Sequence, residues 1–176
     1  MNKLDTIAEL IQNQRGKPPI DKWHPDLSGD IDIVIHSDGR WFHEGGEIKR
    51  HELVKLFASI LRRETDGEYY LVTPVEKWRI QVEDLPLQVI DAEMGDDRIA
   101  VLTNVDDWWI LDDSKPLVVE TDAASGEPRP RVDLDHGLSA RVARAVFYRL
   151  VEQAEVEAGQ LWLQSQGQRF SLGHTE

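Results

Sequence analysis

Apolar residues recur at the spacing of an amphipathic helix in three stretches of the chain, near residues 4–11, 49–64 and 139–157. A strand cannot bury such a stripe on one face, so the pattern predicts a short N-terminal helix and two longer helices. "RGKPP" is predicted to end the first helix, because proline lacks a backbone donor and disfavours helical geometry in the residue before it. The stripes of the two longer helices are Leu53, Val54, Phe57, Ile60 and Leu61, and Val142, Ala143, Val146, Phe147, Leu150, Val151 and Ala154.

Alternating apolar and polar residues predict short strands between these helices. The segment "IDIVIHSDGRWFH" is typical of a β-hairpin with a two-residue turn at Asp38-Gly39, a dipeptide that tolerates positive backbone angles. In that register Phe42 shares a face with Ile35, and Trp41 lies on the opposite face. Further strands are predicted in "EDLPLQVIDAE", "DRIAVLTNV", "WWILDD" and "PLVVE".

Two segments far apart in the chain have similar patterns, and each is predicted to form the same kind of hairpin: "GEYYLVTPVEKWRI" from Gly67 and "GQLWLQSQGQRFSL" from Gly159. The two longer helices share a register when Phe57 is aligned with Phe147. Upstream of each helix, "IDIVIHSDGRWFH" and "WWILDDSKPLVVE" each indicate two strands around a turn. This shared order favours a duplication, although small α+β units can also arrive at it independently.

We therefore predict an α+β protein of two similar domains, each of mainly antiparallel sheet with one main helix, plus an N-terminal helix. The predicted boundaries are 1–19 for the N-terminal helix and linker, 20–90 for the first repeat and 91–176 for the second.

Composition narrows the class of partner. The 176 residues are 40% hydrophobic, which is enough for a substantial core. A formal charge of -13 repels polyanions, so nucleic acid and acidic membrane surfaces are not expected as partners. The absence of cysteine excludes disulfides and cysteine-ligated zinc. No signal peptide or membrane-spanning run is recognisable, so a cytoplasmic location is expected.

The long segment "IDIVIHSDGRWFHEGGEIKRHELVKLFASILRRETDGEYYLVTPVEKWRIQVEDLP", with "GLSARVARAVFYRLVE" later, resembles a bacterial family of unknown function. Its members have two duplicated α+β domains, and the resemblance extends over nearly the whole chain. It implies a C-terminal domain similar to pleckstrin homology folds. It also implies a ligand pocket between the domains, for a nucleotide-like molecule in signal transduction.

Cations near the start of the first main helix are candidates for ligand binding. Arg50 stands on the side of that helix predicted to face the core, and Lys49 precedes it. Because the first helical turn disfavours cations, a negative partner is expected nearby. That partner is either a carboxylate, such as Glu76, Glu83 or Asp84, or a bound anion.

Arg141 and Arg144 fall in the first turns of the helix predicted near residues 139–157. They lie opposite its apolar stripe, which is typical of a solvated face. If both helix starts point at a cleft between the domains, the arginines form an anion site despite the negative total charge. The leading prediction is thus a binding or sensor protein that holds a small anionic, nucleotide-like ligand there. Arg50, Arg141 and Arg144 would supply charge, with Lys49 secondary and Glu76 as a positioning partner.

Two other classes of function stay open. The alternative to ligand binding is a protein-interaction scaffold without a small-molecule ligand, with Trp108-Trp109 as its contact. Adjacent strand residues point to opposite faces, so one of these rings must leave the core that the other enters. An enzyme acting on a phosphorylated small molecule would need a site of scattered residues, since no Gly-rich phosphate loop, dinucleotide fingerprint or nucleophile elbow is present.

The sequence does not favour a metal or a cofactor. His36 and His43 share one face of the predicted hairpin with Asp32, but they lie diagonally and lack a recognised ligand spacing. "HELVK" lacks the second histidine of the zinc-protease helix, because Lys55 stands in its place. The acidic pairs along the chain lack the spacing of a calcium loop.

Overall fold

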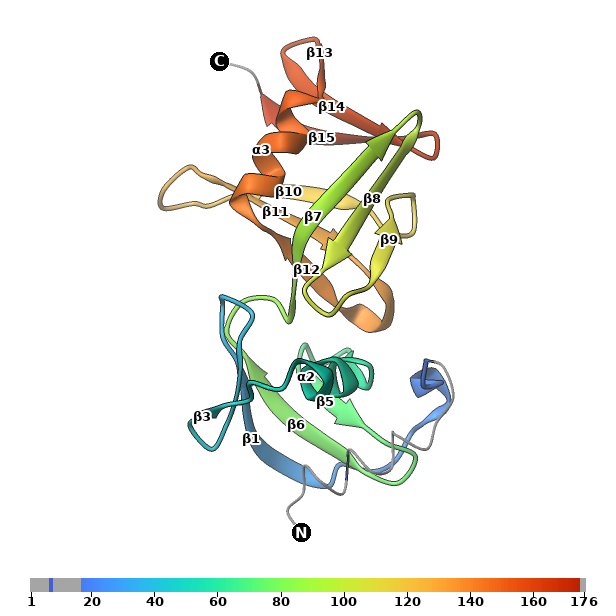
Figure 1. Cartoon of the computed structure of the whole chain (residues 1–176), viewed down its shortest axis with the longest axis vertical. Helices are drawn as coiled ribbons and strands as arrows, with labels where there is room; N and C mark the ends of the chain where they lie inside the picture. Colours follow the sequence, from blue (N-terminus) through green and yellow to red (C-terminus); the bar gives the residue numbers. More distant parts are fainter. Residues whose placement is uncertain (1–6, 8–16, 175–176) are drawn as a thin grey trace. The chain divides into compact units, whose positions relative to one another are not determined.

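The computed structural model describes residue 7 and residues 17–174, which form two compact units (Figure 1). The first unit runs to Pro86 and includes His136–Leu138, and the second comprises Leu87–Asp135 and the chain from Ser139 onward. The division falls before the strand β7 (Leu87–Gly95), so this strand belongs wholly to the second unit. The predicted N-terminal helix lies outside the described residues, apart from residue 7. No helix in the described part of the chain is long and apolar enough to cross a membrane.

The first unit is built on a six-stranded mixed sheet with the order β3-β2-β1-β6-β5-β4. The central pair β1/β6 is parallel, and every other neighbouring pair is antiparallel. The helix α2 (His51–Ala58) connects β3 to β4, which lie at opposite edges of the sheet. The remaining elements are η1 (Ile20–Lys22), β1 (Gly29–Ile35), β2 (Trp41–His43), β3 (Gly46–Glu47), β4 (Leu61–Arg63), β5 (Tyr69–Val72) and β6 (Lys77–Val82).

The second unit repeats this sheet order, β9-β8-β7-β12-β11-β10, again with one parallel pair at the centre, β7/β12. Its helix α3 (Arg144–Glu152) follows the sixth strand of the sheet and leads into a separate three-stranded antiparallel sheet, β13-β14-β15. The remaining elements are β8 (Arg98–Thr103), β9 (Trp108–Ile110), β10 (Leu117–Thr121), β11 (Pro128–Asp133), η2 (Asp135–Gly137), β12 (Ser139–Val142), β13 (Glu155–Glu157), β14 (Gln160–Ser165) and β15 (Gln168–His174).

The prediction of an α+β protein with two similar domains is confirmed, but the equivalent positions differ from the predicted ones. The matching sheet orders make β7–β12 the counterpart of β1–β6. The helix therefore lies between the third and fourth strands in the first unit and after the sixth strand in the second. Both quoted hairpins form, as β5/β6 and β14/β15, yet the second belongs to the separate small sheet. "WWILDDSKPLVVE" is not a hairpin, since β9 and β10 lie at opposite edges of their sheet.

Both main helices are shorter than predicted. The stretch 139–142 is a strand with alternating burial, in which Ala140 and Val142 are buried and Ser139 and Arg141 are half-buried. Alternation and helical spacing overlap in so short an apolar pattern, and parallel pairing with β7 decides in favour of the strand. The helix predicted for residues 49–64 likewise ends at Ala58, and the residues after Ile60 form β4.

The predicted register of the first hairpin is wrong by one residue. His36 N–H donates to the carbonyl of Arg40, so three residues rather than two form the loop, with Gly39 at φ 91°. A one-residue slip exchanges the faces of every side chain on the partner strand. Trp41 therefore pairs with Ile35 in the core, whereas Phe42 stacks on His36 with ring centroids 4.0 Å apart.

Each unit has its own apolar core. In the first unit Phe57 of α2 packs over Trp41, with ring centroids 6.4 Å apart and both residues buried. In the second unit Leu150 of α3 is buried, and Arg149 of the same helix donates to Asp91 Oδ1 at 2.6 Å and to the carbonyl of Ala92 at 2.8 Å. These contacts hold α3 against β7.

The small sheet of the second unit is joined to the large one through Ser165, which is fully buried. Its hydroxyl accepts from Ile99 N–H at 3.0 Å and donates to the carbonyl of Leu111 at 2.6 Å. Ser165→Ala leaves two buried backbone groups without this partner, so we expect the free energy of unfolding to fall by about 2 kcal/mol. Urea unfolding followed by circular dichroism measures the change.

The matched control is Ser171→Ala on β15, where a half-buried hydroxyl makes two long bonds, donating to Gln160 Oε1 at 3.4 Å and accepting from Gly173 N–H at 3.3 Å. That substitution is expected to change the free energy of unfolding by less than about 0.5 kcal/mol. Equal losses in the two variants would mean that Ser165 does not join the sheets in the way described.

Candidate functional site

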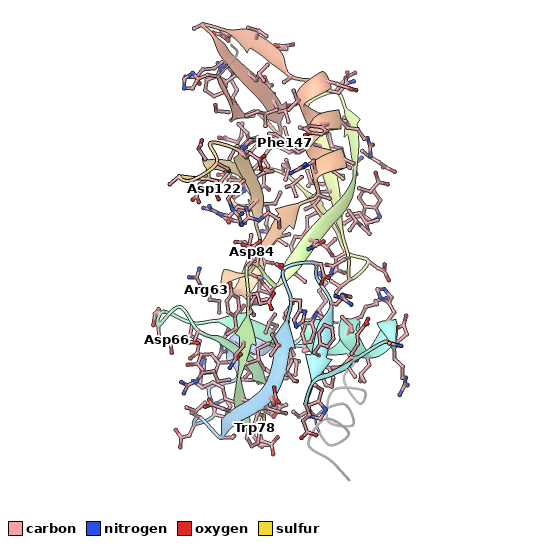
Figure 2. The ribbon with its side chains drawn as sticks, turned by 90° about the vertical axis from the view of Figure 1, so that its left-hand side faces the viewer. Arg63, Asp66, Trp78, Asp84, Asp122 and Phe147 are labelled. Atoms are coloured by element: carbon pink, nitrogen blue, oxygen red, sulfur yellow. The ribbon has the colours of Figure 1, made fainter. Side chains whose placement is uncertain are left out.

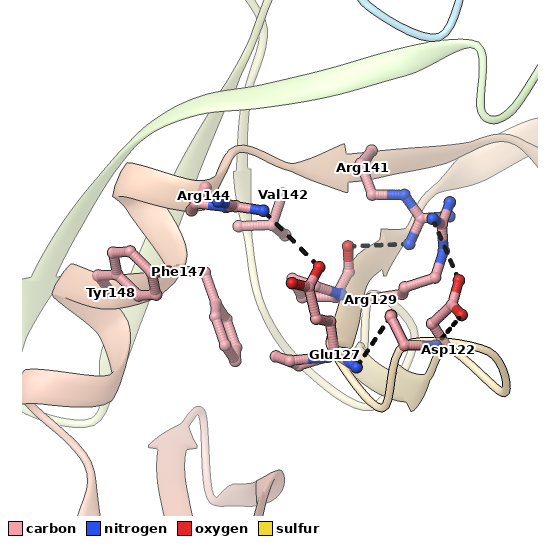
Figure 3. A pocket seen from close by; sticks show the side chains of 11 residues that line it. Asp122, Glu127, Arg129, Arg141, Val142, Arg144, Phe147 and Tyr148 are labelled. Atoms are coloured by element: carbon pink, nitrogen blue, oxygen red, sulfur yellow. Dashed lines mark hydrogen bonds and ion pairs between the residues drawn. The ribbon is translucent and has the colours of Figure 1, made fainter.

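The second unit contains a pocket of about 300 Å³ between the start of α3, the strands β11 and β12, and the β10–β11 turn (Figure 3). Three arginines and two carboxylates line it, which gives a small local excess of positive charge in an acidic protein. The lining residues are Asp122, Ser125, Glu127, Pro128, Arg129, Pro130, Arg141, Val142, Arg144, Phe147 and Tyr148.

Strand alternation places the arginines of this pocket. Arg129 and Arg131 stand two residues apart on β11 and so share a face, and Arg141 of β12 is the cross-strand partner of Arg131. The alternate residues Val132 and Ala140 pair on the other face and are fully buried. Burial of that apolar face therefore fixes the arginines on the opposite one.

The β10–β11 turn is held by Asp122. Its Oδ1 accepts from the backbone N–H groups of Ala124 at 2.8 Å and Ser125 at 2.9 Å, and its carbonyl accepts from Gly126 N–H. Gly126 has φ 74°, a conformation that favours glycine. The hydrogen bond from Ser125 N–H, followed by that from Ala124 N–H, lowers the pKa of the Asp122 carboxyl. The turn thus keeps a charged carboxylate at the rim of the pocket.

The ion pairs inside the pocket are long and exposed. Arg129 Nη1 lies 4.0 Å from Asp122 Oδ2, and Arg144 Nη2 lies 3.7 Å from Glu127 Oε2. The side chains of Arg144 and Glu127 are 74% and 67% exposed. Exposed pairs of this kind contribute little to stability, so exchanging a carboxylate for another anion costs little free energy.

Arg131, beside the pocket, contrasts with these arginines. Its Nε donates to Asp133 Oδ1 at 2.9 Å, and its Nη1 pairs closely with Glu120. The hydrogen bond to Glu120 is the main reason why the pKa of Arg131 is raised. Arg141, its cross-strand neighbour, donates from Nη1 to the carbonyl of Pro130 at 3.2 Å. Arg131 is thus matched by two acids, and the hydrogen bond to Pro130 holds the Arg141 guanidinium along the pocket wall.

The start of α3 forms the apolar wall of the pocket. Ala143 is the N-cap residue and offers no side-chain hydrogen bond, and no acidic residue stands in the first turn. Arg144, the first helical residue, and Phe147 and Tyr148 one turn later line the site. Tyr148 is 57% exposed, so one aromatic ring is accessible at the mouth of the pocket.

The structure corrects the predicted environment of Arg141. It lies on β12 rather than in the first helical turn, so Arg141 and Arg144 are not one helical step apart on a solvated helix face. They nevertheless line the same pocket, one from a strand and one from the helix that follows it.

The candidates in the first unit have different surroundings from those predicted. Arg50 is exposed and precedes α2 as its N-cap, so it does not face the core, and it forms no ion pair within the described residues. Lys49 is also exposed. Glu76 belongs to the β5–β6 turn and accepts from the indole N–H of Trp78 at 3.1 Å. Trp78 is labelled among the side chains of the first unit in Figure 2. Whether Arg50 contacts the same ligand as Arg141 stays a prediction.

The two histidines considered as metal ligands lie on opposite faces of the first hairpin. His43 pairs with Ile33, whereas His36 stacks on Phe42, because of the corrected register. In the part of the chain that the structure describes, no group of three or more His, Asp or Glu residues could hold a metal ion.

Sequence reasoning missed Arg129, which lines the pocket. It stands in "EPRPRVD", where alternate residues are arginines. That alternation was a signal for a strand with a basic face, but the neighbouring prolines and glycine made the segment resemble a loop. Proline is tolerated here because β11 begins with Pro128, and because Pro130 precedes the residues of β11 that pair with β12.

Comparison with family models divides the chain in two. Residues 18–85 match the N-terminal domain model of a family described as a domain of unknown function, DUF1285. Residues 86–172 match the model of the C-terminal domain of the same family, described as a protein of unknown function. No functionally curated protein matches the chain.

Two solved structures are similar to this chain. A DUF1285 family protein from Silicibacter pomeroyi DSS-3 is 39% identical with a TM-score of 0.90, and the match covers 99% of this chain and 96% of that one. A DUF1285 family protein from Shewanella baltica OS155 is 30% identical with a TM-score of 0.56, over 70% of this chain and 92% of that one.

Proposed function

We propose a function for this chain, which belongs to the DUF1285 family, from one feature of its second unit. The pocket lined by Arg129, Arg141 and Arg144 binds a small anionic ligand. The observation that supports this proposal is the gathering of three guanidinium groups around one hollow in a chain with a formal charge of -13.

The chemistry of the arginines fits a phosphate or carboxylate group. A guanidinium presents a planar set of donors that matches two oxygens of such an anion, and this geometry adds specificity to charge. Arg129 and Arg144 have long, exposed pairs with Asp122 and Glu127, so a bound anion can replace these carboxylates. Local charge at contact distance outweighs the distant negative charges, which are screened by salt.

The apolar wall suits a ligand that is more than a bare anion. Pro128, Phe147 and the accessible Tyr148 offer a surface on which a flat ring can lie. A nucleotide-like ligand combines such a ring with a phosphate, and about 300 Å³ is at the small end of known ligand pockets. The wider proposal is a cytoplasmic binding or sensor protein in signal transduction. A likeness of the second unit to pleckstrin homology folds is part of that hypothesis.

A thermal-shift experiment tests the proposal, with inorganic phosphate, a sugar phosphate and a nucleoside monophosphate as probes. A ligand at a hundred times its dissociation constant stabilises by about 2.7 kcal/mol, which raises the melting temperature by several degrees. Arg141→Ala and Arg144→Ala are each expected to weaken binding about 10- to 100-fold, because each removes a charge-assisted hydrogen bond.

Arg149→Ala is the matched control, because Arg149 belongs to the same helix but does not line the pocket. It removes an equal charge and the contacts to Asp91 and Ala92, so it should lower the melting temperature while leaving the ligand-induced shift intact. If all three variants lose the ligand-induced shift equally, the effect is due to overall charge, and binding in the pocket is contradicted. Arg50→Ala shows separately whether the first unit contributes.

A further inference from the structure

The edge strand β9 is the most exposed apolar element of the second unit's large sheet. It is the last strand in the order β10-β11-β12-β7-β8-β9, and within the described residues it pairs only with β8 (Figure 1). Trp108 and Ile110 point to the same face of β9 and are 48% and 39% exposed. Trp109, between them, points to the other face, where Lys115 lies 5.6 Å from its ring. The edge therefore presents large apolar side chains to solvent.

The hydrogen-bonding pattern shows which backbone groups of β9 point outward. Thr103 N–H donates to the carbonyl of Asp107 at 2.9 Å, and Leu111 N–H donates to the carbonyl of Ile99 at 2.9 Å. Antiparallel ladders alternate, so Trp109 exchanges its hydrogen bonds with its partner Val101 on β8. The backbone groups of Trp108 and Ile110 then point away from β8. An added strand would find both side chains and backbone donors and acceptors at these two residues.

Acidic pairs flank this edge on both sides, Asp106-Asp107 before the strand and Asp112-Asp113 after it. Asp112 is ionised in the fold, because hydrogen bonds, first of all from the Ser114 hydroxyl, lower its pKa. Lys115, which lies beside the Trp109 ring, is paired with Asp135 at 2.9 Å. If two β9 strands paired with each other, parallel or antiparallel, acidic residues would face acidic residues at both ends. The acidic pairs therefore disfavour binding of a second copy of the chain at this edge.

We propose that β9 is a docking site for an extended basic segment of a partner protein, which adds a strand to the sheet. The segment would carry small apolar residues at its centre, packing beside Trp108 and Ile110, and lysine or arginine at both ends. This is strand addition, in which backbone hydrogen bonds give affinity and the side chains give specificity. The inference is independent of the anion pocket, since neither of these two residues lines it.

Nuclear magnetic resonance titration of the ¹⁵N-labelled full chain tests the proposal, with the synthetic peptide Lys-Lys-Val-Thr-Val-Lys-Lys as the probe. The expected result is a set of amide shifts centred on residues 107–111. Ile110→Pro should weaken binding by about tenfold, because it removes one outward backbone donor and leaves the pairing of Trp109 with β8 intact. The double substitution Asp107→Lys and Asp113→Lys should reverse the preference. That variant should bind the peptide Glu-Glu-Val-Thr-Val-Glu-Glu more tightly than the lysine peptide.

The control is Val156→Ala on β13, another edge strand with an exposed apolar residue between two acids. It should leave the titration unchanged, whereas Trp108→Ala should weaken it. The proposal is overturned if the peptide causes no shifts, or if the shifts spread over the acidic surface and survive Ile110→Pro. Dimers in sedimentation that Ile110→Pro dissociates would also overturn it, in favour of a second copy as the occupant.

Discussion

Replacing Trp41 by alanine is expected to lower the free energy of unfolding by about 4 kcal/mol, the largest effect among the substitutions considered. Trp41 is 1% exposed, and its ring lies 6.4 Å from that of Phe57, which is fully buried. It joins the β1–β2 hairpin to α2, so the cavity left by alanine separates a sheet from its helix. Urea unfolding followed by far-UV circular dichroism measures the loss.

Trp41→Phe is the control for this prediction. The indole Nε1 of Trp41 is buried and has no hydrogen-bond partner in the described part of the chain, so phenylalanine loses no hydrogen bond there. We expect it to cost less than half of the alanine substitution, because most of the ring volume stays. Equal costs for the two variants would show that packing at this position is not what stabilises the first unit.

Arg62→Met is expected to lower the free energy of unfolding by about 3 kcal/mol. Arg62 Nη1 donates at 2.9 Å to the carbonyls of both Ile20 and Trp23, and its Nη2 lies 2.6 Å from Glu64 Oε2. The side chain of Arg62 is 12% exposed and that of Glu64 is 24% exposed. Methionine fills similar volume but leaves these acceptors unmatched, and the residues before β1 lose their attachment to β4.

The matched control is Arg40→Met, which breaks an exposed pair with Asp38 and should leave the free energy of unfolding nearly unchanged. The free energy of unfolding measured at acidic pH gives a second test of the Arg62–Glu64 pair. Burial raises the pKa of Glu64, but hydrogen bonds from Lys77 and Arg62 outweigh it and leave the pKa lowered. The stabilisation is therefore present above the ordinary pKa of a glutamate and is lost as pH falls through the lowered value. The difference between wild type and Arg62→Met should shrink over that range, and a constant difference would contradict the pairing.

The fold class followed from sequence because it depends on long periodic patterns. The helix around Phe57 and the hairpins quoted from Gly67 and Gly159 were recognisable from spacing alone. Their assembly was not, since the parallel pairs β1/β6 and β7/β12 join segments far apart in the chain. The register of the first hairpin depended on whether Asp38-Gly39 or three residues formed the loop, and short-range propensity allows both.

The candidate site was predicted only in part. Arg141 and Arg144 do line one pocket, but the reason is a strand followed by a helix, not a single helix face. Arg129 was missed because its strand pairing with β10 and β12 is a long-range property. Arg50 was predicted to face the core because it stands three residues before Leu53, a spacing that places two helical residues on one face. The helix α2 starts at His51, one residue after Arg50, so helical spacing does not apply to Arg50.

The short connection between β9 and β10 has a geometrical consequence for the second unit. These strands are the two edges of a six-stranded sheet, and a flat sheet would hold them about 24 Å apart, at roughly 4.8 Å per strand. Residues 111–116 could span about that distance only if fully extended, yet Asp112 and Lys115 exchange backbone hydrogen bonds in a tight turn. The sheet must therefore curl, which brings its two edges closer together than they would be in a flat sheet. Its curvature is imposed by the reach of the chain as well as by packing, and a longer connection would let it open.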